Sequence, residues 1–126
     1  MEYNSDFRFD LKIGNEGEEL FGSLFSGTEM EVKTDFQTHR TGNFYIEYES
    51  RGKPSGIATT QAKYWCLIAT KTPEKTLDDN LLYMITIETD RLKSICRGYL
   101  SSSGTTLGGD NNTSKGILIP ANALMM

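Results

Sequence analysis

Two short runs with strict alternation constrain the fold of this chain more than any other part of its sequence. They are MEVKTDF at residues 30–36 and FYIEYES at residues 44–50, and in each an apolar or β-forming residue recurs at every second position. This is the period of a β-strand that buries one face. The segment between them, QTHRTGN, is rich in turn-forming residues. The pattern therefore predicts an antiparallel hairpin.

The polar face of this predicted hairpin carries many acidic side chains. On the first strand Glu31, Lys33 and Asp35 would share one face, and on the second strand Glu47 and Glu49 would share one face. Like charges that lie opposite each other across a sheet cost roughly 0.2 to 1 kcal/mol per pair, and a bound divalent cation would remove that cost. A solvated face in which Lys33 neutralises its neighbours explains the same pattern, so both interpretations stay open at this point.

The remaining elements predict an α/β protein. Apolar spacing and capping residues predict helices over 15–26, 57–70 and 89–100 and strands over 81–88 and 116–120. The polar segment 101–116 is predicted to be a long loop. The order helix, hairpin, helix, strand, helix, loop, strand indicates a mixed central sheet flanked by helices.

Length and composition limit the class of protein. A chain of 126 residues, 37% hydrophobic and 24% charged, predicts one globular domain over residues 1–126. No apolar run approaches the roughly 20 residues of a membrane span, and the N-terminus lacks the features of a signal peptide, so we expect a cytoplasmic protein without a membrane partner. The net charge of -4 argues against a broad basic patch for polyanions, although acids around a bound metal would contribute to that charge.

The cysteines and the histidine limit metal chemistry. Cys66 and Cys96 are isolated from each other, and His39 is the only histidine. A structural zinc site needs about four such ligands in close pairs, so the sequence excludes one. We expect both cysteines to be reduced and buried.

Cationic and amide side chains flank the acidic residues along the chain. They are Arg40 in the predicted turn, Arg51 and Lys53 after the second strand, and Gln61 and Lys63 in the next predicted helix. Acids in the middle with cations at the edge are typical of a metal-dependent phosphodiester site that also contacts a nucleic-acid backbone. An ordinary turn that leads into a capped helix explains the segment equally well.

Residues 14–69 resemble the PD-(D/E)XK nuclease superfamily, in its small phage-type, junction-resolvase-like or homing-type branches. Glu18 in EGEELF matches the acid of the first helix, and Asp35 in EVKTD matches the first hairpin acid. Glu47 in YIEYE matches the second acid, and Gln61 in TTQAKYW matches the helical glutamine. The resemblance implies a restriction-endonuclease-like core.

The sequence departs from the family pattern at one position. The lysine expected two residues after Glu47 is Glu49, and Lys33, on the same face as Asp35, is the residue that we expect to supply the positive charge. A second threading takes Glu31, Val32 and Lys33 as the E-X-K motif, but it lacks a hairpin aspartate upstream.

The resemblance implies a Mg²⁺-dependent endonuclease, with Mn²⁺ as a substitute ion, that hydrolyses DNA phosphodiester bonds. Asp35, Glu47 and Glu18 would be the metal ligands, and Lys33 or Glu49 would orient or deprotonate the attacking water. A homodimer or higher homo-oligomer is expected if both strands are cut, in the host cytoplasm if the protein is phage-encoded. The alternatives are a catalytically inactive nucleic-acid-binding or regulatory protein on the same fold, and a structural assembly protein with a solvated acidic face.

Overall fold

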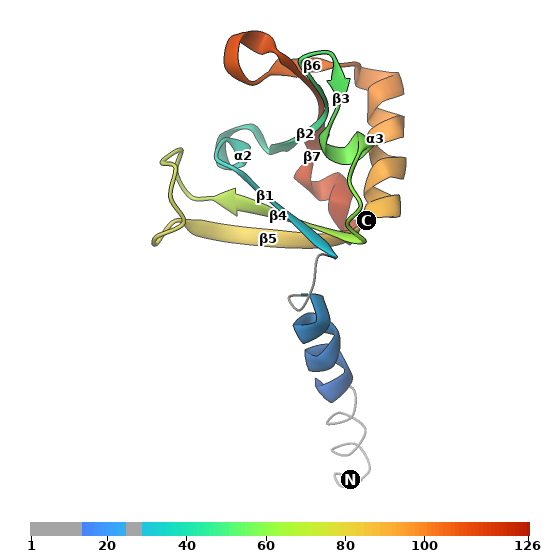
Figure 1. The fold of residues 1–126 in the computed structure, drawn as a ribbon. Helices are drawn as coiled ribbons and strands as arrows, with labels where there is room; N and C mark the ends of the chain where they lie inside the picture. The colour runs from blue at the N-terminus through green and yellow to red at the C-terminus, as the bar shows by residue number, and fades with distance from the viewer. Residues whose placement is uncertain (1–13, 25–28) are drawn as a thin grey trace, which may run out of the picture.

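A computed structural model describes residues 14–24 and 29–126 and arranges their strands in two sheets rather than one (Figure 1). In the first sheet β4 lies between β1, its parallel neighbour, and β5, its antiparallel neighbour. These strands are β1 (Met30–Asp35), β4 (Tyr64–Thr70) and β5 (Leu81–Glu88). The second sheet is antiparallel with the order β3, β2, β7, β6. Its strands are β2 (Asn43–Ser50), β3 (Lys53–Pro54), β6 (Thr106–Gly108) and β7 (Ser114–Pro120).

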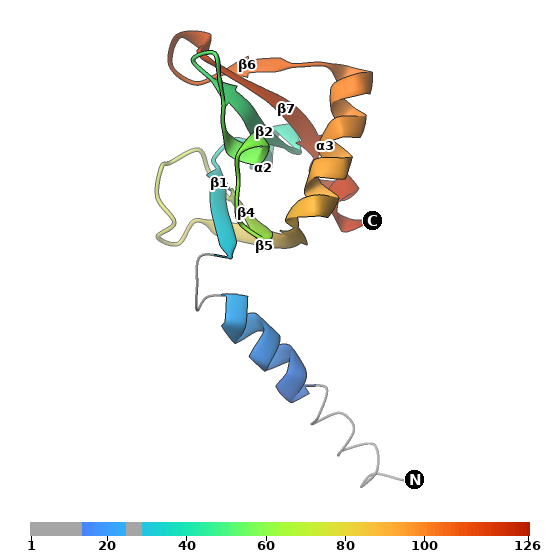
Figure 2. The same ribbon diagram turned by 45° about the vertical axis from the view of Figure 1, so that its right-hand side comes forward.

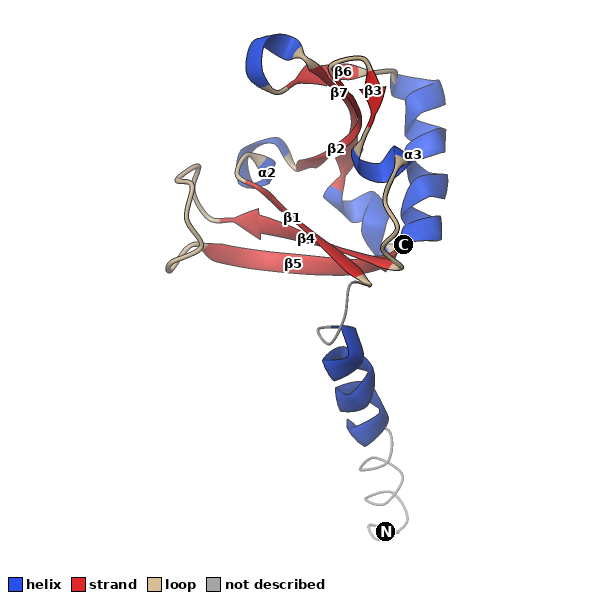
Figure 3. Ribbon diagram, in the orientation of Figure 1, coloured by secondary structure: helices blue, strands red, loops and turns tan. Residues whose placement is uncertain are grey.

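The helical segments connect and flank these sheets (Figure 3). They are a helix over residues 14–24, α2 (Thr38–Thr41), α3 (Thr89–Ser103) and the short turns η1 (Gly56–Ala58), η2 (Asp110–Asn112) and η3 (Ala121–Met125). α3 follows β5 and packs against β7, so it joins the two sheets along one side (Figure 2). The fold is therefore α/β with a mixed three-stranded sheet flanked by helices, as the sequence predicts in outline.

The prediction that β1 and β2 form a hairpin is wrong. Both runs are strands, but Val32 of β1 lies opposite Cys66 of β4, and Ile46 of β2 lies opposite Ile117 of β7. The intervening segment forms α2, which ends at Gly42 in the left-handed conformation (φ 75°) and directs the chain into the other sheet. Alternation indicates which side chains share a face of a strand, but it does not show which strand lies beside it or whether that face is covered, and Val32 on the apolar face of β1 is 52% exposed.

The prediction of a helix over 57–70 is also wrong. Only the turn η1 is helical there, and YWCLIAT is the central strand β4. Six of its seven residues are buried, because β1 and β5 cover its two edges and the core covers the face that carries Trp65, Leu67 and Ala69. A strand buried on both faces has a continuous apolar run rather than an alternating one, and periodicity alone does not distinguish it from a buried helix.

The predicted loop over 101–116 is wrong over much of its length. α3 continues to Ser103, β6 pairs with β7, and β7 already begins at Ser114. The predicted strands over 81–88 and 116–120 and the helix from Thr89 are confirmed. The first predicted helix is confirmed up to residue 24, and residues 25–26 lie outside the described residues.

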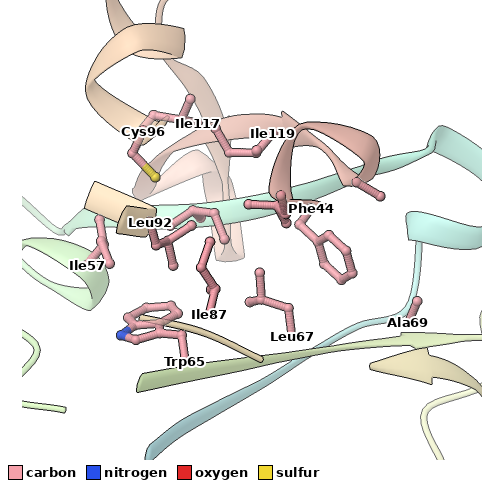
Figure 4. Close-up of a cluster of buried hydrophobic side chains, with 13 residues drawn as sticks. Phe44, Ile57, Trp65, Leu67, Ala69, Ile87, Leu92, Cys96, Ile117 and Ile119 are labelled. Carbon is pink, nitrogen blue, oxygen red and sulfur yellow. The ribbon is translucent and has the colours of Figure 1, made fainter. Parts of the chain in front are cut away.

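The two sheets share one hydrophobic core (Figure 4). Trp65 and Leu67 of β4 point toward Phe44 of β2 and Ile119 of β7, and Leu92 of α3 closes the side. Each of these five side chains is at most 1% exposed. Both sheets contribute side chains to this core. A pocket that opens between the two sheets therefore has apolar core residues at its base.

Both cysteines are free thiols and both are buried, as predicted. Burial raises the pKa of Cys96 to about 11, with a smaller opposing effect of Arg97. A pKa above the ordinary value of 9.0 means that the neutral thiol stabilises the fold below pH 9, and that this contribution is lost as the pH rises through about 11.

At pH 8 we therefore expect iodoacetamide to label Cys96 roughly 100-fold more slowly in the native chain than in the unfolded chain. Peptide mapping by mass spectrometry measures this ratio, and equal rates in the two states would contradict the burial of the thiol.

Candidate functional site

A pocket of about 530 Å³ lies where the end of β1 meets β2, the turn between β4 and β5, and the end of β6. Its inner wall is apolar and is formed by Phe44, Trp65 and Leu67. Three residues that the sequence singled out also line it, and they are Lys33, Asp35 and Glu47. The structure thus brings two carboxylates and an ammonium group to one pocket although β1 and β2 belong to different sheets.

Asp35 fastens the end of β1 to β2. Its Oδ1 accepts a hydrogen bond from the backbone N–H of Gln37 (2.8 Å), and its Oδ2 accepts one from the backbone N–H of Tyr45 (3.0 Å). Its negative charge also reaches Tyr83, whose pKa is raised mainly by burial and further by Asp35. The carboxylate therefore has a role in the fold, and each of its oxygens keeps one further lone pair for a ligand.

Glu47 is held by hydroxyl groups from two other segments. Its Oε2 accepts a hydrogen bond from Ser55 (2.9 Å), and its Oε1 accepts one from the buried Ser114 (2.7 Å). The hydroxyl of Tyr45 lies 2.6 Å from Ser114 Oγ. Because Ser114 donates its proton to Glu47, Tyr45 donates to Ser114. This chain of hydrogen bonds fixes the orientation of the Glu47 carboxylate at the pocket.

Two glycines make room for the Tyr45 ring. A Cβ atom on Gly116 would lie 2.5 Å from the ring, and one on Gly108 would lie 2.9 Å from it. Gly116 is also the β7 residue that pairs with Glu47. The absence of side chains on these glycines therefore lets Tyr45 lie across β7 and β6 and reach Ser114.

A β-bulge separates Glu47 from Glu49. Glu47 pairs with Gly116 and Glu49 with Lys115, so Tyr48 is the extra residue of β2. Gly116 and Lys115 are neighbours on β7 and face opposite sides of the sheet, and paired residues face the same side. The prediction that Glu47 and Glu49 share a face is therefore wrong, because the bulge breaks the alternation. Glu49 instead forms an ion pair with Lys115 (3.2 Å).

Lys33 lies on the same face of β1 as Asp35, as the alternation predicts, and both line the pocket. Its Nζ lies 3.7 Å from the carboxylate of Glu31, and about half of its side chain is exposed. The charge of Lys33 is thus partly offset by Glu31 and remains accessible to a ligand.

The other predicted site residues lie outside the lining of this pocket. Glu18 is exposed on the helix over 14–24, which points away from the two sheets (Figure 1). The predicted DNA-contacting residues are all exposed, and they are Arg40, Arg51, Lys53, Gln61 and Lys63. Arg40 donates to Gln37 Oε1, and Lys63 lies over the ring of Tyr64.

Sequence reasoning missed the groups that hold Glu47 and one cation of the pocket. Ser114 falls in the predicted loop over 101–116, Ser55 lies just before the predicted helix over 57–70, and Lys75 lies between that predicted helix and the predicted strand over 81–88. Tyr45 carried a usable signal, because alternation placed it on the same face as Glu47. No local pattern identifies Ser55, Ser114 or Lys75, since each reaches the pocket through non-local contacts.

The donor set suits a divalent ion that keeps most of its water. Among residues 14–24 and 29–126, no cluster of three or more His, Cys, Asp or Glu side chains is placed to hold a metal. Mg²⁺ is commonly bound through one or two carboxylates, with water and substrate oxygens as its other ligands. Asp35 and Glu47 fit that requirement in number and kind, whereas Glu18 does not join them in this arrangement.

Comparisons with protein-family models, with curated proteins and with solved structures find no match to this chain. None of the helices in the described part of the chain is long and apolar enough to cross a membrane.

Proposed function

We propose that this protein is a Mg²⁺-dependent endonuclease that hydrolyses DNA phosphodiester bonds. The observation that carries the proposal is that Asp35, Glu47 and Lys33 line one pocket beside an apolar wall. Two carboxylates suit a hard divalent cation, and an adjacent ammonium suits the phosphate of the substrate. The proposal includes a restriction-endonuclease-like core, built on the mixed sheet of β1, β4 and β5.

Each pocket residue has a defined part in this proposal. A bound Mg²⁺ ion would supply Lewis-acid stabilisation of the charge that develops on the phosphate. Asp35 and Glu47 would hold that ion, and the hydroxyls of Ser55 and Ser114 keep the Glu47 carboxylate in one orientation. Lys33 would supply a positive charge beside the phosphate and orient the attacking water, in place of the lysine that the family pattern expects two residues after Glu47. The apolar wall strengthens these charge interactions by excluding water.

The wider DNA contacts belong to the same proposal. The exposed residues Arg40, Arg51, Lys53, Gln61 and Lys63 are available to the phosphate backbone outside the pocket. Binding through them weakens as the salt concentration rises. Cleavage of both strands calls for a homodimer or a higher homo-oligomer.

A second function is favoured by a specific observation. All four carboxylate oxygens of Asp35 and Glu47 already accept hydrogen bonds from the chain itself. These bonds give both acids a structural role that needs no metal, as expected for a catalytically inactive nucleic-acid-binding or regulatory protein. The two functions differ in one respect, which is whether DNA is cut.

A nicking assay separates the two functions. With Mg²⁺ or Mn²⁺ the protein is expected to convert supercoiled plasmid to the open-circular form, and with EDTA it is expected to leave the plasmid intact. Supercoiled, linear duplex, single-stranded and four-way-junction DNA are the substrates to compare. The absence of metal-dependent cleavage on all four would contradict the nuclease proposal, and salt-sensitive binding without cleavage would support the inactive alternative.

A further inference from the structure

We propose that Lys75, on the turn between β4 and β5, binds a phosphate group of the nucleic acid in this pocket. The proposal rests on the proposed function and adds a residue that neither the sequence pattern nor the family resemblance assigns. Lys75 lines the pocket together with Lys33, Asp35 and Glu47, although it lies about thirty residues from the nearest of them along the chain.

The charge of Lys75 is less neutralised than that of Lys33. The ion pairs of the described residues join Lys33 to Glu31 and Lys115 to Glu49, and they do not include Lys75. The Lys75 ammonium instead lies 5.9 Å from the centre of the Phe36 ring, which also lines the pocket. A cation–π contact positions an ammonium group without cancelling its charge. Lys75 therefore presents a positive charge that remains available to an anion.

The turn that carries Lys75 is fastened on both sides of this residue. Asn80 is 3% exposed, and its Nδ2 donates hydrogen bonds to the carbonyls of Glu74 (3.1 Å) and Thr76 (3.0 Å). Its Oδ1 accepts from the backbone N–H of Thr72 (2.9 Å). The two carbonyls held by Nδ2 belong to the residues directly before and after Lys75. The backbone of Lys75 is thus ordered before a ligand arrives, which lowers the entropy cost of binding.

The carboxylates of the pocket create the need for such a cation. The two negative charges of Asp35 and Glu47 would balance the charge of a bound divalent ion and leave no net positive charge for the phosphate, and the charge of Lys33 is shared with Glu31. A lysine ammonium acts on phosphate as a point charge and does not require the planar geometry of arginine. Lys75 supplies that charge from a segment separate from both carboxylates.

DNA binding tests this inference independently of cleavage. A fluorescently labelled DNA duplex is titrated in Ca²⁺ over a range of salt concentrations against the wild type and the variants Lys75→Gln, Lys75→Arg and Lys71→Gln. Lys71 is the matched control, because it is an exposed lysine at the start of the same turn and lies outside the pocket lining. Lys75→Gln is expected to weaken binding roughly tenfold at low salt and to lower the salt-dependence slope by about 1. Lys75→Arg and Lys71→Gln are expected to bind like the wild type.

The outcomes separate this inference from the proposed function. If the wild type binds and cuts DNA and Lys75→Gln binds no more weakly than Lys71→Gln, the role of Lys75 is overturned while the nuclease proposal stands. If Lys75→Arg is as weak as Lys75→Gln, the positive charge is not the cause and the inference is likewise overturned. If the wild type neither binds nor cuts DNA, the proposed function fails and this inference fails with it.

Discussion

Replacing Glu47 with glutamine is expected to slow DNA cleavage about 1,000-fold, which corresponds to roughly 4 kcal/mol of lost stabilisation of the transition state. The substitution keeps the shape of the side chain and removes the negative charge that would hold a divalent cation. The initial rate of plasmid nicking in Mg²⁺ measures the effect, and calorimetric titration with Mg²⁺ measures the loss of ion binding separately.

Glu47 is a cleaner test of the site than Asp35. The partners of Glu47 are the hydroxyls of Ser55 and Ser114, which can rotate to accept a hydrogen bond from the new amide group. The partners of Asp35 are two backbone N–H groups, which can only donate. An asparagine at position 35 would direct its NH₂ group at one of them and disturb the fold. A loss of activity at position 35 would therefore mix two causes.

Glu49→Gln is the matched control for this prediction. Glu49 lies two residues further along β2, but its ion pair with Lys115 belongs to the opposite face of the sheet. Loss of this partly exposed pair is expected to lower the stability by less than about 1 kcal/mol and to leave the cleavage rate nearly unchanged. Equal losses of activity in the two variants, or wild-type activity in Glu47→Gln, would contradict the assignment of Glu47.

The sequence predicted correctly that several segments are strands, but it did not predict which strands lie beside them. Alternation identified β1 and β2 as strands and placed Lys33 and Asp35 on one face, because side-chain direction in a strand is a local property. It did not reveal that β1 pairs with β4 or that β2 pairs with β7. Strand pairing depends on contacts between distant segments, and a short connection such as 37–43 can form either a hairpin or a helical turn.

The same limit applies to the candidate site. Lys33, Asp35 and Glu47 were predictable because each lies in an alternating run. The groups that hold Glu47 lie 8 residues away in the case of Ser55 and 67 residues away in the case of Ser114. The bulge at Tyr48 was not predictable either, since it is defined by register against β7. The sequence therefore predicted the charged residues of the candidate site, but it did not predict the residues that hold them in position.

Replacing Gly56 with alanine is expected to destabilise the fold more than a substitution at any other glycine that has positive φ within residues 14–24 and 29–126. A Cβ atom at this position would lie 2.2 Å from the backbone oxygen of Glu47, and φ is +54°. The atom it meets belongs to the backbone of a central strand and cannot move aside as a flexible side chain can. The left-handed conformation costs a non-glycine residue about 1 to 3 kcal/mol, and overpacking adds a similar amount. We expect a total loss of about 3 kcal/mol or more, measured by urea denaturation.

The variant Gly52→Ala distinguishes the cost of the left-handed backbone conformation from the cost of the steric clash with Glu47. Gly52 has φ +79°, yet a Cβ atom there would meet nothing within 4 Å. This variant should carry only the conformational cost, about 1 kcal/mol. An equal loss of stability in the two variants would show that Gly56 does not pack against Glu47.

The comparison of these two glycine variants also tests the candidate site. Gly56 directly follows Ser55, whose hydroxyl donates to Glu47, so a shift of this turn displaces both the backbone and the hydrogen-bond donor of the proposed metal ligand. At a temperature where Gly56→Ala and Gly52→Ala are both folded, cleavage is expected to fall further in Gly56→Ala. The reason is that its strain acts on Glu47, whereas the strain in Gly52→Ala is confined to the turn between β2 and β3.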